Sequence, residues 1–375
     1  MKTRIALLRA MGAARPYDQS RPLEIVEAEL AEPGPGELRV KMAAAGLCHS
    51  DLSVINGDRP RDMPVALGHE ASGVVDAVGS GVTRFAPGDH IVLVFVPSCG
   101  HCVPCAEGRP ALCEPAAVAA GHGTLLSGAR RITAEGAPIN HHIGVSAFSD
   151  YAVVSENSCI KIDKDIPLDL AALLGCAVLT GVGAVLNSGG LRPGQSCAVV
   201  GLGGVGLAGL LGAVAGGAGT VVAVDLAENK RALARDLGAT HAIDPSAPGA
   251  VEEVRNLTGG GVDLAVELAG AVPALQFAYA ITRRGGTTVT AGLPNPAHEL
   301  RIPAVSLTAG EQVLKGSYVG SCVPVRDIPR YARMMVQGQL PVERLLTHRI
   351  KLDEINEGFE RLASGAAIRQ VVIFD

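Results

Sequence analysis

The chain has 375 residues, which is long enough for two domains, and its 48% apolar and 18% charged residues are typical of a globular protein. A net charge of −5 offers no basic surface for nucleic acid. No run of about 18 apolar residues predicts a membrane span, so nucleic-acid and membrane partners are not expected.

The first 177 residues are predicted to form a mostly antiparallel β domain, which the chain after residue 320 completes. Apolar and polar residues alternate over short segments that are separated by proline and glycine turns, a pattern typical of antiparallel strands. These segments are Glu37–Met42, Gly73–Val78 and His90–Val94. The C-terminal part adds a predicted helix at Val325–Gln337 and a predicted strand at Gln370–Phe374.

Four cysteines lie in one short loop. The run Cys99-Gly100-His101-Cys102-Val103-Pro104-Cys105 is followed by Cys113 after a seven-residue gap. Four thiolates can surround one tetrahedral Zn²⁺ and leave no open position, which is typical of a structural zinc. Disulfide pairing is the alternative, but Met1-Lys2-Thr3-Arg4 is not an apolar signal segment, and this spacing in a cytosolic protein favours metal. We therefore expect a structural zinc and a cytoplasmic location.

A second set of candidate metal ligands is dispersed along the chain. Its members are Cys48, the Gly68-His69-Glu70 triplet and Cys176. Two thiolates and one imidazole leave the fourth tetrahedral position for a water or a substrate oxygen, as in catalytic zinc sites. The sequence therefore predicts two zincs per chain, one structural and one catalytic.

The middle third, residues 178–319, is predicted to be an α/β domain with a parallel sheet. Continuous apolar strands alternate with helix candidates such as Glu228–Leu237 and Pro273–Arg283, which is typical of a doubly wound sheet covered on both faces. The predicted strands are Ser196–Val200, Thr220–Asp225, His241–Asp244, Val262–Leu268, Thr287–Leu293 and Val313–Val319.

The first strand-to-helix turn reads Gly201-Leu202-Gly203-Gly204-Val205-Gly206. This G-x-G-x-x-G pattern is weak alone, because a chain with 47 glycines produces it by chance. Here a strand precedes it, a helix follows, and Asp225 ends the next strand 19 residues after Gly206. A pyrophosphate can approach the helix N-terminus, and Asp225 can accept hydrogen bonds from the adenosine ribose. Leu226 and Ala227 come directly after Asp225, so no adjacent arginine offers a partner for a 2′-phosphate, and NAD is predicted over NADP.

Together these motifs resemble those of the zinc-dependent, medium-chain alcohol dehydrogenases over nearly the whole chain. Besides the four-cysteine loop and the glycine turn, the shared segments are Cys48-His49-Ser50-Asp51, Gly68-His69-Glu70-Ala71-Ser72-Gly73-Val74, Cys176 with Thr180, and Ile368-Arg369. The resemblance implies a GroES-like catalytic domain, residues 1–177 and 320–375, and a Rossmann domain, residues 178–319. Residues 124–151 resemble the longer members of the family, which implies a homodimer.

The resemblance also implies roles for individual residues. The catalytic zinc ligands would be Cys48, His69 and Cys176. Glu70 would be a nearby or alternate ligand, Asp51 would orient His69, and Ser50 would hydrogen-bond the alcohol oxygen. The implied cofactor contacts are His49, Thr180, Gly201, Gly203, Gly204, Val205, Gly206, Asp225, Lys230 and Arg369. The implied substrate-pocket residues are Phe95, Val118, His142, Ile143, Leu293 and Tyr318.

The implied function is reversible hydride transfer between NAD and a primary aliphatic or aromatic alcohol, and two alternatives stay open. Glutathione-dependent formaldehyde dehydrogenases share both zinc sites, but they usually carry an arginine shortly after the last structural cysteine. This chain has Glu114-Pro115-Ala116-Ala117-Val118 there. A non-enzymatic member of the fold is the other alternative, but such members commonly lose catalytic zinc ligands.

One position departs from the family pattern. Relatives that pass the alcohol proton to water often have a histidine three residues after the serine or threonine at the zinc, whereas this chain has Ser53. A serine hydroxyl can pass a proton along a hydrogen-bond chain but does not titrate near pH 7. We therefore expect the proton to leave through Ser50, the cofactor ribose and ordered water.

Overall fold

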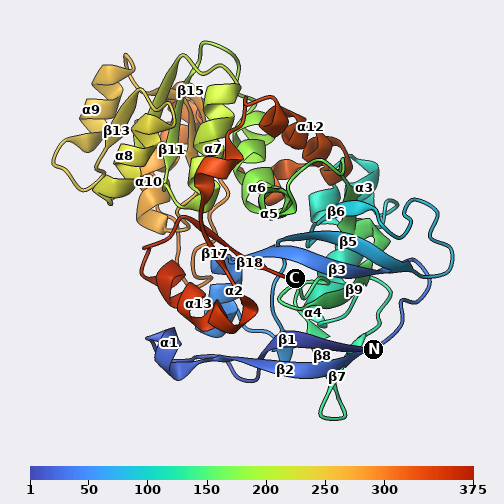
Figure 1. Ribbon diagram of the computed structural model, residues 1–375. Coiled ribbons are helices and arrows are strands. Elements are labelled where there is room, and N and C mark those ends of the chain that lie inside the picture. The colour runs from blue at the N-terminus through green and yellow to red at the C-terminus, as the bar shows by residue number, and fades with distance from the viewer. The chain divides into compact units, whose positions relative to one another are not determined.

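A computed structural model describes the whole chain, residues 1–375, which divides into two compact units (Figure 1). The first unit contains Met1–Cys176, Val323–Val336 and Val342–Asp375. The second unit contains Ala177–Cys322 and Gln337–Pro341. The sequence-based division into 1–177 with 320–375 and 178–319 differs from these units in its boundaries, because residue 177, residues 320–322 and residues 337–341 belong to the second unit.

The first unit is built mainly from antiparallel strands. One group closes into a barrel in the order β1-β2-β7-β8-β4, and a seven-stranded sheet has the order β10-β6-β5-β3-β18-β17, with β9 paired to β3. The barrel strands are β1 (Lys2–Leu8), β2 (Leu23–Leu30), β4 (Val65–Ala66), β7 (Ile132–Ala134) and β8 (Ala137–His141). The sheet strands are β3 (Glu37–Gly46), β5 (Ala71–Val78), β6 (His90–Leu93), β9 (Tyr151–Ser155), β10 (Cys159–Lys161), β17 (Leu346–Ile350) and β18 (Arg369–Ile373).

Alternating side chains of β3 anchor the core of the first unit. Leu38, Val40 and Met42 are fully buried and pack in one hydrophobic cluster with Ile91 of β6 and Phe359. Burial of each such side chain contributes roughly 1.5–3 kcal/mol. This core holds the ends of β3 and β5, which lie next to the candidate metal ligands in the sequence.

Short helices connect these strands. The helices of the first unit are α1 (Tyr17–Ser20), α2 (His49–Ile55), α3 (Val103–Ala106), α4 (Glu114–Gly121), α5 (Leu168–Ala171), α12 (Pro324–Val336) and α13 (Ile355–Ala363). In the chain as a whole, no single helix is long and apolar enough to cross a membrane, although the bent pair Leu168–Gly175 and Ala177–Ser188 passes by length and composition.

The second unit contains a six-stranded parallel sheet in the order β13-β12-β11-β14-β15-β16. This is the 3-2-1-4-5-6 order of dinucleotide-binding sheets. The strands are β11 (Ser196–Val200), β12 (Thr220–Val224), β13 (His241–Ile243), β14 (Val262–Glu267), β15 (Thr282–Thr290) and β16 (Val313–Gly316). The predicted fifth strand, Thr287–Leu293, begins too late, because β15 already pairs at Thr282 and passes an irregularity before Thr287.

Helices lie on both faces of this sheet (Figure 1). On one face, α9 and α10 bury Val254 and Ala278 against alternate residues of the strands. The helices of this unit are α6 (Ala177–Gly183), α7 (Gly204–Ala215), α8 (Glu228–Asp236), α9 (Ala250–Leu257), α10 (Val272–Ile281) and α11 (Ala304–Ala309). A π-helical turn, Ala184–Ser188, extends α6.

Candidate functional site

The four cysteines of the loop converge on one point in the first unit. Their sulfur atoms all lie within 4.8 Å of one another, and none of the nine cysteines of the chain forms a disulfide. Cys102 and Cys113 directly precede α3 and α4, so two helix starts set the loop geometry. Backbone N–H groups donate to two of the sulfurs, from Cys102 to Cys99 at 3.3 Å and from Cys99 to Cys113 at 3.2 Å. The arrangement fits a closed four-thiolate metal site.

Protonation differs among these thiols. The backbone N–H of His101 lowers the pKa of Cys99 to about 6, whereas burial raises the pKa of Cys105 to about 12. Because a metal binds thiolates, metal binding must displace protons from the cysteines that hold them. The affinity of this loop for metal therefore falls as the pH falls.

The four residues of the dispersed set also come together, from three separate places in the first unit. Cys48 precedes α2, His69 and Glu70 lie between β4 and β5, and Cys176 follows a 3-10 helix at Ala172–Gly175. All four are buried, and their ligand atoms lie within 4.8 Å of one another. Cys176 Sγ and His69 Nε2 are 3.6 Å apart. A sulfur and a nitrogen bound to one tetrahedral zinc are separated by about 3.6 Å, so the residues fit zinc.

The two cysteines of this set differ in acidity. A hydrogen bond from Cys176 lowers the pKa of the Cys48 thiol well below its ordinary value, and the same contact raises that of Cys176. Cys176 therefore holds its proton more tightly than Cys48, and metal binding must displace that proton.

Asp51 on α2 holds His69 from the side opposite to the metal ligands. Its carboxylate oxygens lie 3.1 and 3.2 Å from Nδ1 of His69, and it accepts the backbone N–H of Gly68 at 3.1 Å. Burial acts to raise the pKa of Asp51, but His69 and His142 hold it below its usual range. An ionised Asp51 keeps the proton of His69 on Nδ1, so that Nε2 is available to a metal.

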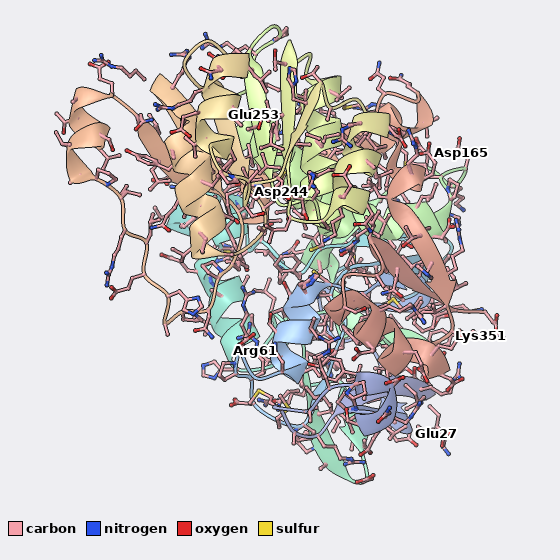
Figure 2. The ribbon with its side chains drawn as sticks, turned by 90° about the vertical axis from the view of Figure 1, so that its left-hand side faces the viewer. Glu27, Arg61, Asp165, Asp244, Glu253 and Lys351 are labelled. Carbon is pink, nitrogen blue, oxygen red and sulfur yellow. The ribbon has the colours of Figure 1, made fainter.

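His142 is a second partner of Asp51 that the sequence reasoning missed. Its Nδ1 lies 3.0 Å from Oδ1 of Asp51, and its ring packs edge-on against His69 with the centroids 5.5 Å apart. Burial lowers the pKa of His142 although Asp51 opposes the shift, and the nearby His69 and Arg61 (labelled in Figure 2) add to the lowering. The sequence signal was a polar ring among the pocket residues, but nothing in the sequence linked it to Asp51.

Glu70 and Arg369 form a buried ion pair next to the metal ligands. Nη2 of Arg369 contacts Oε2 of Glu70, and Arg369 is only 3% exposed. Burial raises the pKa of Glu70 to about 7, although the charge of Arg369 opposes the shift. Oε1 of Glu70 has no hydrogen-bond partner and is therefore the oxygen that could reach a metal. The contact of Arg369 with a pyrophosphate stays a prediction.

Helix α2 also carries Ser50, which is expected to hydrogen-bond the alcohol, and His49, an expected cofactor contact. Ser50 and His49 stand in its first turn. The hydroxyl of Ser53 donates to the backbone carbonyl of His49 at 2.8 Å, one turn earlier in the helix. Ser53 is therefore engaged within its own helix, as a serine often is at such a position.

The glycine turn has the geometry of a dinucleotide site. Gly201 adopts φ +91°, and a Cβ on Gly206 would lie 1.7 Å from the carbonyl oxygen of Gly201. No side chain caps the N-terminus of α7, and no atom lies within 4 Å of a Cβ placed on Gly203. The open backbone N–H groups of a twelve-residue helix suit a phosphate.

Asp225 braces this turn from the end of β12. Its two oxygens accept the backbone N–H groups of Leu202 at 2.7 Å and Ala227 at 2.9 Å. Lys230 is half-buried on α8, one turn further along the chain. Thr180 and Val205, two further predicted cofactor residues, lie on the neighbouring helices α6 and α7. Gly181, the residue after Thr180, lets α6 pack tightly against the backbone of Val205.

Glu267, at the end of β14, is a buried carboxylate that the sequence reasoning did not single out. Its Oε1 accepts the backbone N–H groups of Ala269 at 2.8 Å and Gly270 at 2.6 Å, and its Oε2 accepts the Thr290 hydroxyl at 2.7 Å. It thus ties together the loops at the carboxyl ends of β14 and β15, the edge at which such sheets bind ligands. In the sequence, the only sign of this role was that Glu267 is a carboxylate at the end of a mostly apolar strand.

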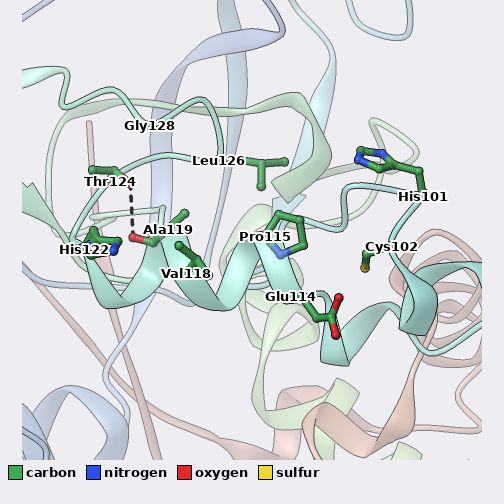
Figure 3. Close-up of a pocket in the computed structure, with 10 residues that line it drawn as sticks. All are labelled: His101, Cys102, Glu114, Pro115, Val118, Ala119, His122, Thr124, Leu126 and Gly128. Carbon is green, nitrogen blue, oxygen red and sulfur yellow. Dashed lines mark hydrogen bonds between the residues drawn. The ribbon is translucent and has the colours of Figure 1, made fainter.

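The predicted substrate-pocket residues fall into separate places. Phe95 lies next to the dispersed metal ligands, where its ring is edge-on to that of His69 with 5.2 Å between the centroids. Ile143 directly follows His142 and adopts φ +43°. Val118 lies in a groove of about 670 Å³ between α4, the four-cysteine loop and residues 124–128 (Figure 3). Leu293 and Tyr318 belong to the second unit and are exposed.

Comparisons with known proteins cover both units. Residues 34–164 match the family described as "Alcohol dehydrogenase GroES-like domain", and residues 204–337 match "Zinc-binding dehydrogenase". A Mycobacterium tuberculosis protein with the provisional name alcohol dehydrogenase D is 39% identical over 376 residues, covering 100% of both chains. Among solved structures, an alcohol dehydrogenase zinc-binding domain protein from Burkholderia ambifaria has a TM-score of 0.94 and 36% identity, covering 100% of this chain and 99% of that one. Benzyl alcohol dehydrogenase from Acinetobacter calcoaceticus has a TM-score of 0.93 and 31% identity, covering 100% of both.

Proposed function

The chain belongs to the zinc-dependent, medium-chain alcohol dehydrogenase family of oxidoreductases, and on this premise we propose that it transfers hydride reversibly between a primary alcohol and NAD. The observation that carries the proposal is the cluster of Cys48, His69 and Cys176, with 3.6 Å between the donor atoms of the last two. Three protein ligands leave one tetrahedral position for the substrate. Their presence also argues against a non-enzymatic member of the fold.

Two zincs per chain are part of this proposal. Cys48, His69 and Cys176 would hold the reactive zinc, and the four-cysteine loop would hold the structural one. When bound, the reactive zinc supplies Lewis acidity at the substrate oxygen, and the dinucleotide accepts the hydride. Ser50 would hydrogen-bond the alcohol oxygen. The ring of Phe95 would cover the three zinc ligands on the side of His69.

NAD is the proposed coenzyme. The glycine turn leaves room for a pyrophosphate at the start of α7, and Asp225 is held there by two backbone N–H groups. A fixed carboxylate can accept hydrogen bonds from ribose hydroxyls but repels a 2′-phosphate.

A medium-chain or aromatic alcohol is the proposed substrate. The similarity to benzyl alcohol dehydrogenase at 31% identity supports an aromatic substrate, as does the half-buried ring of Phe95 next to His69. The glutathione-dependent reaction is less favoured, because α4 begins at Glu114 and has no arginine in the segment after Cys113, where those enzymes usually carry one for the glutathione carboxylate.

A homodimer is the proposed assembly. The strand β16 lies at the edge of the six-stranded sheet and pairs only with β15. Apolar side chains nearby in the sequence are exposed, with Val313 at 48% and Val305 at 72%. An unpaired edge with exposed apolar residues favours association. Sedimentation equilibrium tests the dimer, and a monomer would refute it.

One screen tests the reaction. The zinc-loaded protein is assayed with NAD⁺ against aliphatic and aromatic alcohols, with and without glutathione, by following the absorbance of NADH. We expect turnover of benzyl or medium-chain alcohols without glutathione. Turnover of formaldehyde only with glutathione would establish the alternative, and no turnover of any alcohol by protein with two zincs would refute the proposal.

A further inference from the structure

Three N–H groups crowd one oxygen of Asp51. The backbone N–H of Gly68 lies 3.1 Å from Oδ1, Nδ1 of His69 lies 3.2 Å from it, and Nδ1 of His142 lies 3.0 Å from it. The other oxygen, Oδ2, lies 3.1 Å from Nδ1 of His69. Asp51 therefore does not serve the metal ligand His69 exclusively.

The contact with His142 is close but not aligned as a hydrogen bond. Because a bare Nδ1 would set its lone pair against an ionised carboxylate, the proton of His142 must lie on Nδ1. The ring is buried and packs edge-on to His69 with an interplanar angle of 87°. The orientation of His142 is thus fixed by its packing against His69 and by the contact of its N–H group with the Asp51 carboxylate.

The shared carboxylate has a consequence for metal binding. A carboxylate that accepts the Nδ1 proton of a ligating histidine makes Nε2 a stronger donor to the metal. The N–H dipole of His142 lies 3.0 Å from the same oxygen and attracts its charge even without hydrogen-bond alignment, which leaves less charge for the hydrogen bond to His69. His142 therefore weakens the hold of Asp51 on His69.

We propose that His142 is a positioning residue of the reactive metal site, which acts through Asp51 to limit how strongly His69 donates to the metal. The inference rests on the proposed function, because it requires that His69 bind a metal. A weaker His69 donor leaves the metal more electrophilic toward a substrate oxygen. The contact with His142 thereby lowers the affinity of the reactive site for its metal and raises the Lewis acidity of the bound metal.

Two substitutions separate the N–H group from the ring. His142→Phe keeps an aromatic ring against His69 and removes the N–H group. His142→Asn removes the ring but retains an N–H donor at the position of Nδ1. Asp51→Asn serves as a reference, because it removes the charge that strengthens His69.

The measurement is the rate at which the reactive zinc passes to a chromophoric chelator at one fixed pH. We expect His142→Phe to release it more slowly, by roughly 10-fold, the lower end of the range for outer-shell partners. His142→Asn should release zinc at the wild-type rate, and Asp51→Asn should release it faster. In protein with cobalt at this site, the visible absorption bands should shift in His142→Phe but not in His142→Asn.

The outcomes distinguish the inference from the proposed function. Two zincs in the wild type with equal or faster release from His142→Phe would overturn the inference alone, as would identical rates in His142→Phe and His142→Asn. Only one zinc per chain in the wild type, held by the four-cysteine loop, would overturn the proposed function and the inference with it.

Discussion

The preference for NAD over NADP should depend on the charge of Asp225. This carboxylate is held by the N–H groups of Leu202 at 2.7 Å and Ala227 at 2.9 Å, so it cannot rotate away from a ligand at the glycine turn. Replacement by asparagine keeps the size of the side chain and removes its charge. One backbone N–H group then faces an amide N–H group and loses its acceptor.

The two effects have different signatures. At a separation of about 4 Å and an effective dielectric constant of about 20, one unit of charge on the 2′-phosphate is repelled by about 4 kcal/mol. That energy corresponds to about 1,000-fold in kcat/KM. The lost N–H hydrogen bond costs about 1–3 kcal/mol but loosens the turn for both coenzymes alike. Asp225→Asn should therefore lower activity with NAD while it raises the NADP-to-NAD ratio.

The assay is kcat/KM for the two coenzymes with one alcohol at saturation. Asp263 is a matched control, because it lies on β14 of the same sheet and accepts the backbone N–H group of Ser196 at 2.7 Å. Asp263→Asn should leave the ratio unchanged, whereas Asp225→Asn should change it by at least about 100-fold. Equal kcat/KM values for NAD and NADP in the wild type would show that Asp225 does not face the ribose and would refute the reasoning.

Three further outcomes are expected. Metal analysis should find two zincs per chain. Cys48→Ala should lose one zinc and nearly all turnover, whereas Cys102→Ala should lose the other zinc and have a lower unfolding temperature. Full activity in Cys48→Ala would disprove the assignment of the reactive site. Ser50→Ala should reduce kcat strongly and Ser53→Ala only mildly, because the Ser53 hydroxyl is bound within its own helix; equal losses would make Ser53 part of the proton path. Burial lowers the pKa of His141 to about 4 from its ordinary value of 6.5. As the pH drops from 6.5 to 4, the imidazole therefore takes up a proton in the unfolded chain before it does in the folded one. The free energy of unfolding should fall by about 3 kcal/mol over this range. Urea titrations should show a smaller acid loss in His141→Gln, and an unchanged slope would contradict a neutral buried ring.

Much of the fold follows from local patterns. Continuous apolar strands and the glycine turn are short-range signals, and β11 coincides with the predicted Ser196–Val200. The late start predicted for β15 has a physical cause. Its first residues include Arg283 and Arg284, which are exposed, so the strand begins with a polar segment that does not have the apolar pattern of a buried strand.

The ligand types and their spacing identified both candidate metal sets, because zinc chemistry restricts its ligands to a few side chains. The partners of those ligands depended on the tertiary structure. Nothing local links His142 to Asp51 or Arg369 to Glu70, since each pair is joined only after separate strands and helices have packed.

The sequence by itself determined the two-unit organisation, the glycine turn and the residues able to hold zinc, because these depend on residue type and on spacing along the chain. Only the tertiary structure decided which charges surround them. It brought three N–H groups to one oxygen of Asp51 and buried Arg369 against Glu70. The physical reason is that electrostatic interactions depend on distance in space and on burial, and neither quantity can be read from separation along the chain.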